Sequence, residues 1–136
     1  MAPPFLDTNI FLYAISTDPA EAGKRDIALA ALDRGGALSV QVLQEFYVQA
    51  TRPARGGALS HDEAVGLVQA WLRFPVQETT LALMHDALAL RAVHRLSYRD
   101  AAIVAAARAL DCREILSEDL SHGQRIGGVT IRNPFR

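Results

Sequence analysis

The sequence predicts a single α/β domain in which short buried strands alternate with helices. Short apolar runs stand at residues 5–6, 37–38, 114–116 and 129–131, and the longer segments between them carry apolar residues at helical spacing. Strands that alternate with helices favour a mainly parallel sheet. A chain of 136 residues can bury one core of its own, so we expect one domain over residues 1–136.

Cap and stop signals define the expected helices. The first follows the strand Phe5-Leu6, with Asp7 or Thr8 near its cap, and Gly35-Gly36 ends the second. Ser60 and Glu63 form a capping box. The expected helices run over residues 9–15, over 20–34, from the Ser39 cap to Arg52-Pro53, from the Ser60 capping box through Leu72, and over 80–95 and 98–110.

Two segments are expected to be loops, and a third is expected to be a strand or a connector. Residues 54–59 read as a Gly-rich loop and residues 117–128 as a polar loop, and residues 74–76 form either a strand or a connector. Trp71 and Cys112 are interpreted as core residues. The residues expected to face inward from the helices are Ile27, Ala28, Ala31, Leu32, Val42, Leu43, Phe46, Ala50, Val65, Val68, Leu72, Leu83, Ala87, Leu90, and Val93 or Leu88.

Composition narrows the class of protein. Half of the residues are hydrophobic, 21% are charged and the net charge is −1, which is typical of a soluble globular protein. Overall charge does not indicate nucleic-acid binding, so a nucleic-acid substrate would need local patches or a metal. The single cysteine fits a reducing compartment, and neither a signal peptide nor a membrane span is evident. We therefore expect a cytoplasmic protein with no membrane partner.

Four acids stand at or near the ends of predicted elements. Asp7 follows the first strand, Asp119 follows the strand at 114–116, and Glu45 and Asp100 lie on helices. Each has an ordinary structural explanation: an N-cap for Asp7, a partly exposed acid for Glu45, half of a capping box for Asp100 and a turn for Asp119. Parallel sheets bind ligands beyond the carboxyl ends of their strands. If the first strand and strand 114–116 are neighbours, these acids converge in one crevice.

Converging carboxylates require compensation, because they repel one another when they are brought within a few ångströms. A divalent cation removes that repulsion, and Mg²⁺ prefers oxygen ligands. Such an ion activates water and stabilises charge on a phosphodiester. Taken together, the four acids are therefore less easily explained by four separate structural roles.

Four stretches of the chain, in order and spacing, resemble the PIN-domain ribonucleases, and most of all the VapC-type toxins of bacterial toxin–antitoxin pairs. The stretches are FLDTNIFLYA, LQEFYVQATR, SYRDAAIVAAARALDC and ILSEDLSHGQRIGGVTIRNPF. The resemblance runs from residue 5 to residue 135. It implies a PIN-like three-layer domain with a short, mainly parallel sheet flanked by helices. It also implies an endoribonuclease that uses Mg²⁺, with Mn²⁺ as an alternative, and that acts on RNA as a homodimer controlled by a VapB-type antitoxin.

The resemblance also assigns roles to residues. It places the catalytic acids at Asp7, Glu45, Asp100 and Asp119. Asp7, Asp100 and Asp119 would hold the metal directly or through water, and Glu45 would position a bound water or a second metal. The supporting residues would fix carboxylates or touch substrate; they are Thr8, Asn9, Ser117 and Arg99. Arg99 stands where the family often has an aromatic residue, and it adds a positive charge beside the acids.

Several weaker interpretations remain open at this point. Arg52 and Arg55 flank the Gly-rich loop and are either phosphate contacts or solvated charges, and His122 is at most a minor substrate contact. A receiver-like signalling domain is disfavoured because it needs paired acids after the first strand and a late lysine. An aspartyl phosphatase is disfavoured because Asn9 stands where a second aspartate is required. A catalytically silent PIN-fold module that binds RNA or protein is the alternative. Since asparagine also caps helices, Asp7→Asn and Asp100→Asn are both expected to leave the fold nearly intact.

Overall fold

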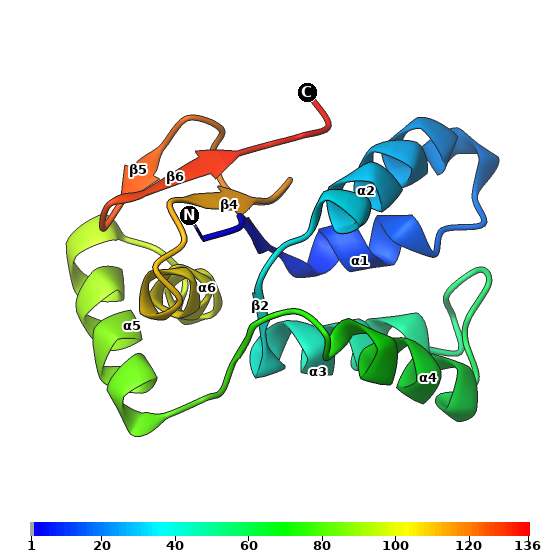
Figure 1. Cartoon of the computed structure of the whole chain (residues 1–136), viewed down its shortest axis with the longest axis horizontal. Coiled ribbons are helices and arrows are strands. Elements are labelled where there is room, and N and C mark those ends of the chain that lie inside the picture. The colour runs from blue at the N-terminus through cyan, green and yellow to red at the C-terminus, as the bar shows by residue number, and fades with distance from the viewer. Residues whose placement is uncertain (1) are drawn as a thin grey trace.

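The computed structural model describes residues 2–136, in which six α-helices surround short strands (Figure 1). The strands are β1 (Phe5–Leu6), β2 (Leu38–Ser39), β3 (Val76–Gln77), β4 (Glu114–Leu116), β5 (Arg125–Ile126) and β6 (Val129–Arg132). The helices are α1 (Thr8–Ala14), α2 (Ala22–Arg34), α3 (Val40–Ala50), α4 (His61–Trp71), α5 (Leu81–His94) and α6 (Tyr98–Ala109), with a short 3-10 turn η1 (Pro19–Glu21) before α2.

β1 lies between β2, which follows it early in the chain, and β4, which follows it late. β1, β4 and β6 run parallel in that order, and β5 pairs antiparallel with β6 at the edge. β2 and β3 form a second parallel pair. A parallel bridge between Phe5 and Ala37 joins the two, and the Leu6 amide donates to the Ala37 carbonyl over 2.8 Å. Strand order therefore reverses between β1 and β4, and a crevice forms at the carboxyl ends of strands where order reverses.

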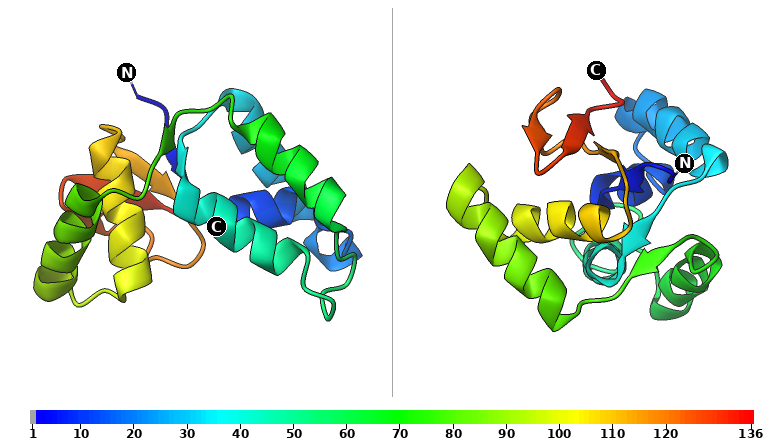
Figure 2. Two further views of the ribbon diagram at one scale, coloured as in Figure 1. Left: turned by 90° about the horizontal axis from the view of Figure 1, so that it is seen from below. Right: turned by 60° about the vertical axis from the view of Figure 1, so that its left-hand side comes forward.

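Helices cover the sheet in a three-layer α/β arrangement, as the sequence predicts (Figures 1 and 2). α5 packs against α6, α2 packs against α1, and α4 packs against α3. α6 is buried around almost its whole circumference, since residues 101–107 are all buried. In the described part of the chain, no helix combines the length and the apolar composition needed to cross a bilayer.

Most predicted core residues are buried, and the exceptions have a geometric reason. Val93 is 74% exposed, and Leu88, Leu72 and Ile27 are also exposed, so the predicted inward direction of these four residues was wrong. On α4 the inward stripe is set by Ala64 and Trp71 instead. The Trp71 ring packs edge-on against Phe11 and Phe46, with 4.7 Å between ring centroids in each pair, and this turns Leu72 outward. Cys112 is buried, as predicted, and burial raises the pKa of its thiol to about 11, helped by the charge of Asp111.

The polar loop predicted over residues 117–128 was also partly wrong, because it contains β5. Residues Gly127 and Gly128 both adopt positive φ, 56° and 85°, and they join β5 to β6 as a two-residue hairpin turn. Only glycine adopts such angles readily, and Gly-Gly is a known hairpin signal. That signal is present in the sequence but lies inside an otherwise polar segment.

Gly36 allows the chain to approach β1 closely enough for the bridge to form. A Cβ atom at this position would lie 2.4 Å from the Cδ1 atom of Leu6, whose side chain is fully buried. Gly36→Ala should therefore lower the free energy of unfolding by about 1–3 kcal/mol through overpacking, as measured by urea denaturation.

Gly66→Ala is the matched control for this substitution. Gly66 lies inside α4, and no heavy atom would lie within 4 Å of an added Cβ. Alanine is the better helix former, so the free energy of unfolding should rise by up to about 1 kcal/mol. Equal effects of the two substitutions would contradict the close approach at Gly36.

Candidate active site

Asp7 lies at the junction of β1 and α1, at the point where strand order reverses. Its backbone N–H donates to the Leu116 carbonyl of β4 over 3.0 Å, and its side chain caps α1 by accepting from the Thr8 amide at 2.7 Å. The hydroxyl of Ser117, directly after β4, donates to Asp7 Oδ2 at 2.7 Å. Asp7 is fully buried, so these contacts replace the water that a carboxylate requires.

Arg99 gathers three carboxylates around one guanidinium. Arg99 Nη2 contacts Asp7 Oδ1 at 2.7 Å and Glu45 Oε1 at 2.6 Å, and Nη1 contacts Asp100 Oδ1 at 3.1 Å. Asp7 caps α1, Glu45 lies on α3, and Asp100 lies beside Arg99 in the first turn of α6. Three helices are therefore tied together at the crevice by one side chain.

The contacts in this cluster favour the charged forms of Glu45 and Arg99. Burial alone would raise the pKa of Glu45, but hydrogen bonds from Arg99 and Thr8, together with the charge of Arg99, lower it below its usual value. Burial opposes the charge of Arg99, yet its hydrogen bonds to Glu45 and Asp7 raise its pKa further. Glu45 is thus a carboxylate and Arg99 a cation at neutral pH.

Asp119 is positioned from the opposite side of the crevice by Asn9. Asn9 Nδ2 donates to Asp119 Oδ2 at 3.2 Å, and Asn9 Oδ1 accepts from the Glu118 amide at 3.4 Å. The Asp119 amide donates to Ser117 Oγ at 3.1 Å. Ser117 therefore connects the loop that carries Asp119 to the buried Asp7.

A cavity of about 390 Å³ opens over these groups. Glu45, Asp100 and Asp119 line it, and the buried Asp7 does not. The structure thus brings the four predicted catalytic acids to one crevice at the carboxyl ends of the strands. The four predicted supporting residues meet the acids there through hydrogen bonds; they are Thr8, Asn9, Ser117 and Arg99. Their catalytic, metal-binding and supporting roles stay predictions.

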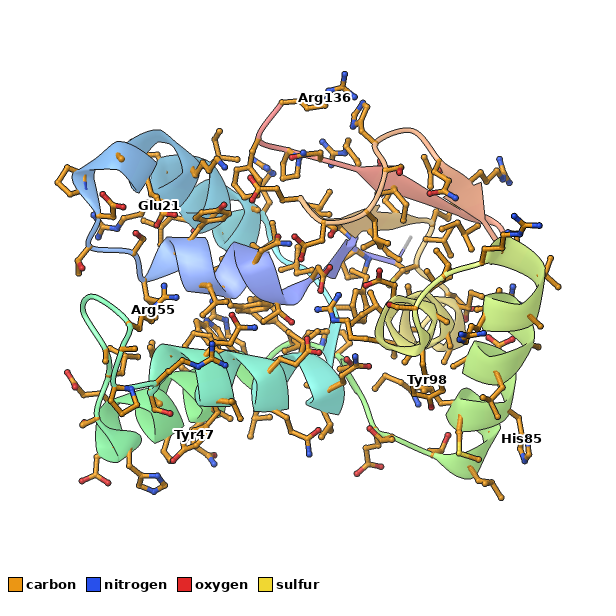
Figure 3. The ribbon with its side chains drawn as sticks, turned by 180° about the vertical axis from the view of Figure 1, so that it is seen from behind. Glu21, Tyr47, Arg55, His85, Tyr98 and Arg136 are labelled. Carbon is orange, nitrogen blue, oxygen red and sulfur yellow. The ribbon has the colours of Figure 1, made fainter. Side chains whose placement is uncertain are left out.

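Among the weaker candidates, Arg55 belongs to the cavity. It reaches from the loop after α3 toward the end of α1, where Nη2 lies 3.5 Å from the Leu12 carbonyl (Figure 3). Arg52 is exposed and does not line the cavity; it lines an adjoining shallow hollow on α3. His122 does not line the cavity, and its Nδ1 accepts from the Asn133 amide at 3.0 Å. His122 therefore has a structural role in its loop.

One group of interacting side chains beside the cavity was missed in the sequence. Tyr13 and Lys24 both contact the Glu118 carboxylate, and the Lys24 ammonium lies 4.9 Å from the centroid of the Tyr13 ring. Burial, together with the hydrogen bond to Glu118, raises the pKa of Tyr13. The three residues come from α1, α2 and the loop after β4, and no local spacing in the sequence connects them.

The donor atoms suit a hard divalent cation, but they do not form a ready-made cage. Within residues 2–136, no three His, Cys, Asp or Glu side chains lie close enough to share one metal ion. The Arg99 guanidinium lies among the carboxylates instead. Three carboxylates face this one cation, so the cluster keeps an excess of two negative charges. All of the candidate donors are oxygens, which Mg²⁺ and Mn²⁺ prefer.

Asp7→Asn and Asp100→Asn should differ in their effects on stability. Asp7 accepts four hydrogen bonds in a buried site, and an amide nitrogen there would face a donor. We expect Asp7→Asn to lower the free energy of unfolding by about 2–4 kcal/mol, which revises the sequence-based expectation of an intact cap. The Asp100 side chain is 26% exposed. Ser97 caps α6 through the backbone N–H of Asp100, so Asp100→Asn should lose about 1 kcal/mol or less.

Urea denaturation of the two variants beside the wild-type protein measures this difference. Indistinguishable losses would contradict the geometry, since only one of these carboxylates is enclosed by donors.

Comparison with known proteins is consistent with this architecture. The PIN domain family matches residues 5–124. A toxin–antitoxin complex from Klebsiella pneumoniae is similar in structure, with a TM-score of 0.71 and 21% identity over 96% of this chain and 97% of that chain. VapC20 from Mycobacterium tuberculosis, described as a sarcin–ricin loop cleaving toxin, has a TM-score of 0.65 and 22% identity over 85% of this chain and 88% of that chain.

DNA-bound VapBC from Salmonella typhimurium has a TM-score of 0.68 and 19% identity over 98% of this chain and 99% of that chain. No curated protein sequence matches the chain significantly. Identities at this level carry the fold alone, whereas the family match covers most of the chain. The sequence-based resemblance is confirmed, and the chain belongs to the PIN domain family.

Proposed function

We propose that the protein is a metal-dependent endoribonuclease toxin that hydrolyses phosphodiester bonds in RNA and is neutralised by a VapB-type antitoxin. The observation that carries the proposal is the convergence of Asp7, Glu45, Asp100 and Asp119, from four separate segments, at one crevice. Membership of the PIN domain family supports a nuclease. The toxins among the similar structures support the toxin–antitoxin setting.

Asp7, Asp100 and Asp119 are the proposed holders of a Mg²⁺ or Mn²⁺ ion, which would supply an activated water and neutralise charge on the phosphodiester. Ser117 and the Thr8 amide fix the orientation of the Asp7 carboxylate. Asn9 holds Asp119 at the cavity wall. Rigid positioning of this kind lowers the cost of bringing the reacting groups together.

Glu45 is proposed to orient the attacking water. Its carboxylate lines the cavity, and Thr8 Oγ1 donates to it over 2.6 Å. Because its pKa is lowered, Glu45 accepts hydrogen bonds at neutral pH and does not donate them. That state suits a group that takes a hydrogen bond from water.

The RNA backbone is proposed to lie across the cavity toward Arg55. The overall charge of −1 gives no general attraction for RNA, so binding depends on local cations. Arg55 lines the cavity from the loop after α3 (Figure 3). An RNA substrate also implies action in the cytoplasm.

The protein is further proposed to form a homodimer. Leu81 and Leu88 lie seven residues apart on one face of α5, and both are exposed, at 67% and 48%. Exposed apolar side chains gathered on one element are typical of an interaction surface. A two-fold dimer would bury the same patch on both copies.

Cleavage of RNA by purified protein tests the proposed activity. Wild-type protein should cut RNA with Mg²⁺ or Mn²⁺ and stop when EDTA removes the ion. Asp100→Asn removes a charge from the cavity with little loss of fold, so cleavage should fall at least about a hundredfold, with partial recovery at high Mn²⁺. Rates are read from the ends of labelled RNA fragments.

Asp86→Asn is the matched control. Asp86 pairs with Arg108 over 3.2 Å and does not line the cavity, so the same chemical change there should leave cleavage unchanged. Cleavage by Asp100→Asn at the wild-type rate, or cleavage that EDTA does not affect, would refute the mechanism. Tight RNA binding without any cleavage would identify the protein as a silent PIN-fold binding module.

A further inference from the structure

We propose that Arg99 competes with the divalent ion for Asp7, so that a metal binds Asp7 only after the Arg99 guanidinium has left. This inference rests on the proposed function, because it concerns the same metal site. Arg99 would then set the concentration of Mg²⁺ or Mn²⁺ at which the site binds its ion.

The hydrogen bonds of Asp7 leave no acceptor position for a metal ion. A carboxylate offers about four lone-pair positions on its two oxygens. Oδ1 accepts from the Thr8 amide and from Arg99 Nη2, both at 2.7 Å. Oδ2 accepts from Ser117 Oγ at 2.7 Å and from Arg99 Nη1 at 3.3 Å. All four positions are therefore taken, and Asp7 is fully buried, so no free lone pair faces the cavity.

Two of these four donors belong to elements that cannot withdraw. The Thr8 amide is part of the first turn of α1, and Ser117 follows β4, which is paired with β1. Arg99 is the only one of the three donor residues whose contact is made by the end of a long side chain. A metal ion that binds Asp7 must therefore replace Arg99.

Arg99 also occupies the other carboxylates of the cluster. Its Nε donates to both oxygens of Glu45, at 3.2 and 3.0 Å, and Nη1 donates to Asp100 at 3.1 Å. Loss of these contacts on metal binding is compensated by the ion, whose double charge serves the same carboxylates.

Arg99 has a route out of the cluster. Its side chain is 31% exposed and lines the cavity, so the guanidinium can turn into open space. The backbone of Arg99 stays in place, because Ser97 caps α6 by accepting from the N–H of Asp100, the residue after Arg99. Side-chain rotation is sufficient, and no element of the fold has to move.

Metal binding by the RNA-free protein tests this competition. Isothermal titration with Mn²⁺ should show that Arg99→Gln binds the ion at least about tenfold more tightly than the wild-type protein. In Arg99→Gln the ion no longer has to break a hydrogen-bonded charge pair, and the free energy of such a pair corresponds to about a tenfold change in affinity.

Arg55→Gln separates competition from simple electrostatics. Arg55 lines the same cavity, and its guanidinium donates to a backbone carbonyl, the Leu12 oxygen. The substitution removes the same charge without vacating Asp7, so it should raise affinity much less than Arg99→Gln. Equal affinity of Arg99→Gln and wild type, or equal gains in the two variants, would overturn the proposal.

A second measurement uses the wild-type chain and does not depend on the folding of Arg99→Gln. In arginine-labelled protein, the Arg99 Nε–H, which Glu45 holds, should give a protected ¹⁵N–¹H signal, identified by its loss in Arg99→Lys. Saturating Mg²⁺ should abolish that protection. An unchanged Arg99 signal in metal-saturated protein would overturn the proposal.

The failure of this inference differs from the failure of the proposed function. If the wild-type protein and Arg99→Gln bind Mn²⁺ equally and the wild-type protein cuts RNA, only the proposed role of Arg99 is wrong. If Arg99→Gln binds Mn²⁺ more tightly but the wild-type protein cuts no RNA under any condition, the competition is supported and the proposed nuclease activity is wrong.

Discussion

The ion pair between Arg99 and Asp7 is the interaction on which the site depends. Asp7 is a fully buried acid at the junction of β1 and α1, and burial of an unpaired carboxylate is strongly unfavourable. Arg99 supplies the opposite charge, and Ser117 and the Thr8 amide supply the remaining hydrogen bonds. These partners bring together the start of α1, the start of α6 and the loop after β4. The same contacts that stabilise the buried acid therefore assemble the crevice.

Parts of the fold that lie away from the cavity also support this arrangement. β1 lies between β2 and β4, so the segments that follow it and its neighbours open toward one crevice. The small side chains of α6 let this helix lie deep in the molecule, with its first turn at the acids. Gly36 lets the chain before β2 approach Leu6. Packing far from the cavity thus determines where Asp7 and Asp100 lie relative to each other.

The acids could be located from the sequence because each stands at a signal that can be read locally. Asp7 and Asp119 follow short apolar strands, and Ser97 marks the helix start that carries Asp100. The placement of Arg99 could not be read in this way, because its contact with Asp7 spans 92 residues of chain and depends on the finished fold. The same holds for Tyr13, Lys24 and Glu118. Helical spacing was insufficient for Val93 and Leu72, since neighbouring helices decide which residue of a broad apolar stripe is covered.

Diffraction from crystals of the wild-type protein soaked in Mn²⁺ tests whether the ion replaces Arg99 at Asp7, because the anomalous signal locates the ion without reference to activity. We expect an anomalous peak bound to an oxygen of Asp7, with the Arg99 guanidinium turned away from that carboxylate. A peak at full occupancy elsewhere on the molecule, with Arg99 still paired to Asp7, would contradict it.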